Sequence, residues 1–138
     1  MILLKFNFLS KTEIMKNAFY IIVVFLALTA CTEQAEIKVQ NLVHNASLED
    51  INYGDYSIEY LLYPGKTSDG RVITDDAQNW PKSEQVEFYM VRDGNMVYLR
   101  TRASYTLNPD DELLIVIADT TEVISPFGKK SALADIAD

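Results

Sequence analysis

Two alternating segments, residues 84–92 and 95–102, flank the dipeptide Asp93-Gly94 and constrain the fold more than any other part of the chain. Asp and Gly tolerate positive φ, and this dipeptide is typical of the two-residue turn that closes a β-hairpin. Such a turn fixes the register of its strands. One face is predicted to pair Met90 with Val97, Phe88 with Leu99 and Val86 with Thr101, and the other to pair Val91 with Met96, Tyr89 with Tyr98 and Glu87 with Arg100.

Short strand-like segments continue on both sides of this hairpin. Tyr56–Tyr63 is rich in aromatic and branched residues, and further strands are expected near 37–40, 71–74, 103–107, 113–118 and 122–124. Residues 41–54 are expected to form a loop with one helical turn at most, and 66–83 to be mainly irregular. The unbroken apolar run 113–118 is typical of a central strand that is covered on both faces.

No segment has the apolar period of a helix long enough for a parallel crossover. The sequence therefore predicts an all-β fold, a small antiparallel β-sandwich of about seven strands after an N-terminal signal helix. A small barrel is the alternative. Leu107-Asn108-Pro109 before an apolar strand resembles a corner of immunoglobulin and fibronectin III sandwiches, although Leu113 stands where those domains carry a tyrosine.

The N-terminal part has the three regions of a secretory signal, namely a basic start at Lys16, an apolar run over 18–28 and small residues before a cut. Its 16 uncharged residues, 17–32, fall short of the roughly 20 that span a bilayer comfortably. A cleaved signal is therefore favoured over a transmembrane helix. Met15, directly before Lys16, is the expected translation start.

The signal ends in Leu28-Thr29-Ala30-Cys31, which resembles the lipobox of bacterial lipoproteins at every position. The resemblance implies that signal peptidase cuts between Ala30 and Cys31, and that Cys31 carries fatty acyl chains such as palmitate. These chains would anchor the protein in a membrane of the cell envelope, and Thr32 in place of Asp favours the outer membrane. The expected divisions are a signal peptide over 1–30, a lipidated tether over 31–36 and a β-sandwich over 37–138. The alternative for Cys31 is an unmodified thiol.

The part after the expected cleavage site is strongly acidic. It holds 9 basic and 19 acidic residues, a net charge of -10. Such a field disfavours nucleic acid and anionic lipid headgroups, and it suits solubility, a basic partner or divalent cations.

Few residues point to catalysis or to a cofactor. His44 is the only histidine, in a predicted loop, and Cys31 is the only cysteine, so nucleophilic catalysis and a zinc site are not expected. Carboxylates cluster at 75–76 and 110–112, where calcium binding or carboxylate-based hydrolysis stays formally open, but neither cluster has EF-hand spacing. We expect no catalytic residue, no metal and no cofactor.

Aromatic residues are the most distinctive remaining feature. Seven of the eight tyrosines and the single tryptophan follow the expected cleavage site. The predicted hairpin register leaves an apolar group on its outward face, so a binding surface is predicted from Tyr89, Tyr98, Val91, Met96 and Trp80. The alternative is that a second layer, formed by residues 126–136 or by the loop around Trp80, covers the hairpin residues as a second core. The leading hypothesis is a lipid-anchored, non-enzymatic binding or assembly module with a protein or glycan partner. The alternatives are a small envelope hydrolase or carbohydrate-active enzyme and a purely structural accessory.

Overall fold

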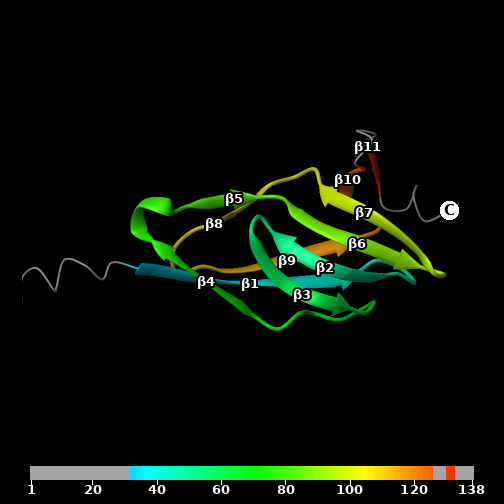
Figure 1. Ribbon diagram of the computed structural model, residues 1–138, viewed down its shortest axis with the longest axis horizontal. Helices are drawn as coiled ribbons and strands as arrows, with labels where there is room; N and C mark the ends of the chain where they lie inside the picture. Colours follow the sequence, from blue (N-terminus) through cyan, green and yellow to red (C-terminus); the bar gives the residue numbers. More distant parts are fainter. Residues whose placement is uncertain (1–31, 126–129, 133–138) are drawn as a thin grey trace, which may run out of the picture. The chain divides into compact units, whose positions relative to one another are not determined.

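The computed structural model describes residues 32–125 and the backbone of 130–132 (Figure 1). The predicted signal peptide, its cleavage site and Cys31 lie outside the described residues. The described strands are β1 Thr32–Leu42, β2 Ser47–Tyr53, β3 Tyr56–Leu62, β4 Arg71–Asp76, β5 Lys82–Glu84, β6 Val86–Arg92, β7 Asn95–Thr101, β8 Tyr105–Leu107, β9 Glu112–Ala118, β10 Glu122–Ile124 and β11 Lys130–Ala132, with one 3-10 turn, η1, at Ala77–Asn79.

The strands form two main sheets. The larger has the order β11-β10-β7-β6-β2-β3 and the smaller has the order β4-β1-β9, while β5 and β8 make a separate pair. Within the described residues every strand pair is antiparallel except β1 with β9. The sheets lie over one another, with β3 beside β1 (Figure 1). The predicted all-β sandwich is confirmed.

One hydrophobic core joins the two sheets. Both sheets supply fully buried side chains to it, including Ile37, Val39, Ile115 and Ile117 from the smaller sheet and Leu48, Phe88 and Leu99 from the larger. Burying one such side chain contributes about 1.5 to 3 kcal/mol, so this cluster supplies the main favourable free energy of folding.

The predicted hairpin is present with the predicted register. Phe88 lies opposite Leu99, Tyr89 opposite Tyr98 and Glu87 opposite Arg100. Asp93 and Gly94 have φ of 50° and 81°, as a primed two-residue turn requires. The Asp-Gly pair therefore sets which side chains of β6 and β7 face outward.

Residues 47–53 differ from the prediction, because they form strand β2 and not a loop. The reason is a β-bulge, where the pairing of β2 with both neighbours shifts register between Glu49 and Asn52. Asp50 adopts a φ of 48° there. Leu48 and Ile51 are both buried although they are three residues apart, so the two-residue alternation that identifies a strand is interrupted.

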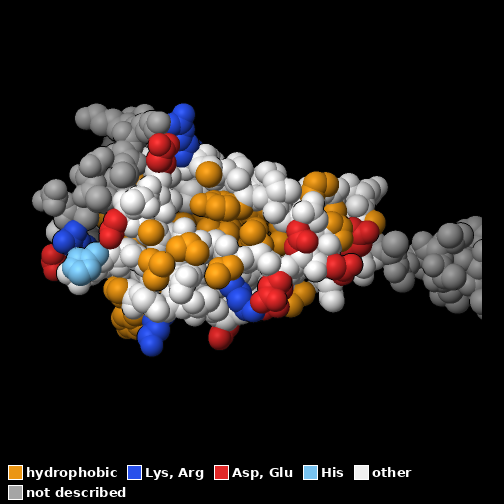
Figure 2. All heavy atoms as spheres, turned by 180° about the vertical axis from the view of Figure 1, so that it is seen from behind, with side chains coloured by type: hydrophobic (Ala, Val, Ile, Leu, Met, Phe, Trp, Pro, Cys, Tyr) orange, Lys and Arg blue, Asp and Glu red, His pale blue; other side chains and the backbone are white. Residues whose placement is uncertain are grey.

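Strand β9 also differs from the prediction, because it lies at an edge of the smaller sheet. The side chains of Leu114 and Val116 are 50% and 40% exposed, while Ile115 and Ile117 are buried. The prediction of a central strand covered on both faces is therefore wrong. In the view from behind, hydrophobic side chains gather along the middle of the surface (Figure 2).

The first strand begins at Thr32, where a polar tether was expected up to residue 36. Residues 32–37 pair with β4, and the backbone of Gln34 and Glu36 bonds to Asp110 and Asp111 at 2.8 Å. Ala35 is buried between these contacts. The polar side chains that suggested a tether lie mainly on the other face of a paired strand.

Candidate partner-binding surface

The outward face of the hairpin carries a group of four side chains, Tyr89, Val91, Met96 and Tyr98, which we call the tyrosine patch. The ring centroids of Tyr89 and Tyr98 are 5.2 Å apart and the rings are tilted by 55°. Val91 pairs with Met96 in the next row of the same face. The tyrosines and Val91 are half-buried, whereas Met96 is 57% exposed.

A carboxylate fixes one edge of the tyrosine patch. The hydroxyl of Tyr98 donates to Glu87 Oε2 at 2.6 Å. This hydrogen bond, followed by partial burial, raises the pKa of Tyr98 to about 12. Arg100 Nη1 lies 3.6 Å from the other oxygen of Glu87. The Tyr98 ring is thus held in one orientation and stays neutral at physiological pH.

Both neighbouring strands extend this face. On β2, Glu49 lies opposite Tyr89 and Ser47 opposite Val91, and on β10 Ile124 lies opposite Arg100. The patch therefore has an aromatic and aliphatic centre with polar and charged side chains around it, which is the composition of many protein interfaces.

Trp80, the fifth predicted surface residue, lies in a different cluster around Asp75. Asp75 Oδ2 accepts from Lys82 Nζ at 2.6 Å and from the Tyr56 hydroxyl at 3.4 Å, and Oδ1 accepts from Asn79 Nδ2 and the Asp76 backbone at 2.8 Å. The Trp80 indole N–H donates to the Asp75 backbone oxygen at 3.3 Å. The structure thus brings together four of the five predicted residues.

The Lys82 ammonium completes this Asp75 cluster. It lies 5.3 Å from the centroid of the Tyr56 ring and 5.5 Å from that of the Trp80 ring, within cation–π range. Its hydrogen bond lowers the pKa of Asp75 and raises the pKa of Lys82 itself. Sequence reasoning missed this constellation, because its members come from β3, β4, the η1 turn and β5 and share no spacing.

Two carboxylates of the second predicted acidic cluster, 110–112, also accept hydrogen bonds within the protein. Asp111 Oδ2 accepts from the Asn108 backbone and side chain at 3.1 and 2.7 Å. Glu112 Oε1 accepts from Lys38 Nζ at 2.6 Å, and this bond lowers the pKa of Glu112. His44 donates its backbone N–H to Asp119 at 3.1 Å. No group of three or more metal-ligating side chains converges among the described residues.

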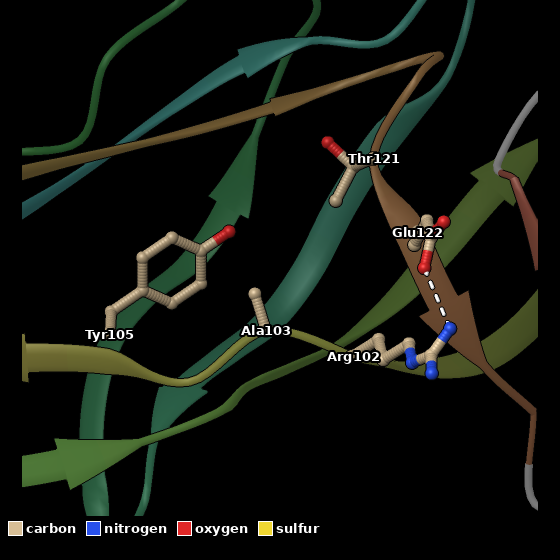
Figure 3. Close-up of a pocket in the computed structure, with 5 residues that line it drawn as sticks. All are labelled: Arg102, Ala103, Tyr105, Thr121 and Glu122. Atoms are coloured by element: carbon tan, nitrogen blue, oxygen red, sulfur yellow. Dashed lines mark hydrogen bonds and ion pairs between the residues drawn. The ribbon is translucent and has the colours of Figure 1, made fainter.

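A shallow hollow of about 450 Å³ lies where β7, β8 and β10 meet (Figure 3). Arg102 and Glu122 point toward one another on one side, with 3.1 Å between Nη1 and Oε2. Ala103 lies just before β8 and Tyr105 is the first residue of β8, and burial raises the pKa of Tyr105. This hollow has apolar and paired charged walls, and sequence reasoning did not find it because its residues come from two segments, 102–105 and 121–122, that are distant in the sequence.

Comparison with known proteins finds no matching family model, no similar curated protein and no similar solved structure. Among the residues that the structure describes, none forms a helix with the length and apolarity needed to cross a bilayer.

Proposed function

We propose that this protein is a lipoprotein of the bacterial cell envelope that acts as a non-enzymatic binding or assembly module. Cys31, acylated after cleavage behind Ala30, would hold it on a membrane, and the outer membrane is favoured by Thr32. The observation that carries the binding role is the tyrosine patch, where two tyrosine rings in tilted contact and an exposed methionine share one sheet face.

The chemistry of the patch favours a protein partner over a glycan. Tyrosine, methionine and arginine are enriched in the centres of protein interfaces, and all three occur here within two paired strands. The 55° tilt between the Tyr89 and Tyr98 rings gives no flat platform for a sugar ring. An aromatic pair with a fixed hydroxyl is also ordered before binding, which lowers the entropic cost of association.

Two of the carboxylates that the sequence singled out, Asp75 and Glu112, do not have the property of a general acid. A general acid at neutral pH needs a raised pKa, as in glycosidases. The pKa values of Asp75 and Glu112 are instead both lowered by hydrogen bonds from lysines. These side chains act as structural anchors for Lys82 and Lys38.

The proposal is tested by photo-cross-linking in intact cells. A benzophenone amino acid at Met96 is expected to give one defined protein adduct, and the same group at Tyr60, on β3 and 71% exposed, is the matched control. Tyr89→Ala with Tyr98→Ala should abolish the Met96 adduct. The double variant should still fold, because a cross-strand pair contributes only about 0.2 to 1 kcal/mol.

Equal adducts from both positions, or a Met96 adduct that persists in the folded double variant, would contradict the role of the patch.

A further inference from the structure

Strand β9 has one partner strand and one open side. In the smaller sheet it pairs only with β1 among the described residues. The open side is separate from the tyrosine patch, which lies on the larger sheet. A ligand bound at the open side of β9 would therefore not occupy the tyrosine patch.

The parallel pairing identifies the backbone groups on the open side. Asp111 O accepts from the Glu36 N–H at 2.8 Å, and alternate residues of a parallel strand bond to the same neighbour. Leu113, Ile115 and Ile117 therefore bond to β1, while Leu114 and Val116 direct their N–H and C=O groups to the open side. Ala118, the next residue in that series, is satisfied by Thr121, whose hydroxyl and N–H lie at 2.9 and 2.8 Å.

The side chains of the same two residues are also exposed. Leu114 and Val116 project from the outer face of the sheet, and no charge, proline or bulge interrupts 113–118. Sheet edges are normally protected by such features. Two other edge strands follow this rule, because β4 carries Arg71, Asp75 and Asp76, and β3 carries Glu59 beside the bulge in β2.

Charge decides which kind of strand fits this edge. Asp110, Asp111 and Glu112 lie at the start of β9, and Asp119 and Glu122 follow its end. Lys38 forms an ion pair with Glu112, and Arg102 forms an ion pair with Glu122. Acidic charge therefore remains in excess at both ends of β9. A second copy of the chain would bring acid against acid whether it paired parallel or antiparallel, and like charges at an interface are costly.

We propose that the open side of β9 accepts an extended segment of a partner protein as an added strand. This segment has apolar side chains at alternate positions, which cover Leu114 and Val116, and basic residues toward its ends. Main-chain hydrogen bonds to Leu114 and Val116 give affinity, and the flanking carboxylates select the basic ends. The added strand makes β9 an internal strand of the smaller sheet, with its apolar side chains beside Leu114 and Val116.

The test uses the full-length protein in detergent and the synthetic peptide Ac-KKTVTVTVKK-NH2. With a Kd of about 0.1 mM, peptide at about 1 mM should slow amide hydrogen exchange at Leu114 and Val116 about tenfold, because exchange slows by the factor 1 + [peptide]/Kd. Exchange at Ile115 and Ile117 should not change, because those amides already bond to β1. The same peptide with Glu in place of Lys should bind about tenfold more weakly.

Two further reagents separate strand addition from general hydrophobic association. Of two peptides N-methylated on alternate residues, one should lose binding and the other retain it, because an added strand bonds through one side only. Val116→Lys should weaken binding of the acetylated lysine peptide. Val72→Lys, on the β4 edge of the same sheet and 54% exposed, is the control and should leave binding unchanged.

Absence of slowed exchange at Leu114 and Val116 overturns the proposal. It is also overturned if these amides are protected without peptide in a sample that sediments as a dimer, since a second copy is then the occupant. Equal binding of the Glu peptide overturns the choice of a basic segment. Tyr89→Ala with Tyr98→Ala should bind the peptide normally, so failure of this proposal is distinguishable from failure of the tyrosine patch.

Discussion

At the scale of single residues, Gly94 shows how one backbone angle sets a functional surface. Its φ of 81° closes the hairpin turn, and no atom lies within 4 Å of the position that a Cβ would occupy. A side chain there meets open space, so any cost of substitution comes from the backbone. This turn fixes the register of β6 and β7, and the register places Tyr89 and Tyr98 together on the outward face.

Gly94→Val is therefore expected to destabilise the domain by about 1 to 3 kcal/mol, the cost of a β-branched residue in a left-handed conformation. Denaturant unfolding measures the change in the free energy of unfolding. Gly94→Asn is the matched control and should cost less, because Asn tolerates positive φ. An unchanged unfolding midpoint for the valine variant would show that the turn does not need this conformation.

At the scale of elements, the Asp75 cluster joins β3, β4 and β5 across the η1 turn. The carboxylate of Asp75 holds Lys82 at 2.6 Å, and Tyr56 and Trp80 flank the ammonium. The hydrogen bond from Lys82 lowers the pKa of Asp75 in the folded state. The contribution of this pair to stability is therefore present above the unfolded pKa of about 3.9 and is lost as the pH falls below it.

Asp75→Asn should flatten the fall in the free energy of unfolding that the natural protein shows as the pH decreases below about 4. Urea unfolding at a series of pH values measures this slope. Asp69→Asn, in the exposed loop before β4, is the control and should leave the slope nearly unchanged. Identical slopes for the natural protein and Asp75→Asn would contradict the lowered pKa of Asp75.

The elements also show which features the sequence can predict. Asp93-Gly94 acts locally, so the register of β6 and β7, which places Tyr89, Val91, Met96 and Tyr98 on one face, could be predicted correctly. Strand β2 could not, because the bulge at Asp50 places Leu48 and Ile51 on the same side and hides the alternation. The edge position of β9 and the Asp75 cluster depend on contacts between distant segments, which periodicity does not encode.

At the scale of the whole molecule, the proposed anchor predicts a defined processing defect. Cys31→Ala should leave the signal uncleaved and unacylated, because the cysteine is the residue that receives the lipid in the lipobox resemblance. Mass spectrometry of membrane fractions measures both changes in one experiment. The natural protein should begin at Cys31 and carry the added lipid mass. A mature natural protein that begins elsewhere without lipid would contradict the anchor.

The start of β1 at Thr32 has a mechanical consequence for a protein anchored in this way. One residue spans at most about 3.6 Å, so a lipid on Cys31 is attached almost directly to a paired strand. A pull on that lipid is transmitted along β1, which lies between β4 and β9. The force must slide β1 past both neighbours at once, so many hydrogen bonds share the load and none is opened singly. In the proposed lipoprotein, β1 would therefore be a stiff attachment, because its paired residues begin directly after the acylated position.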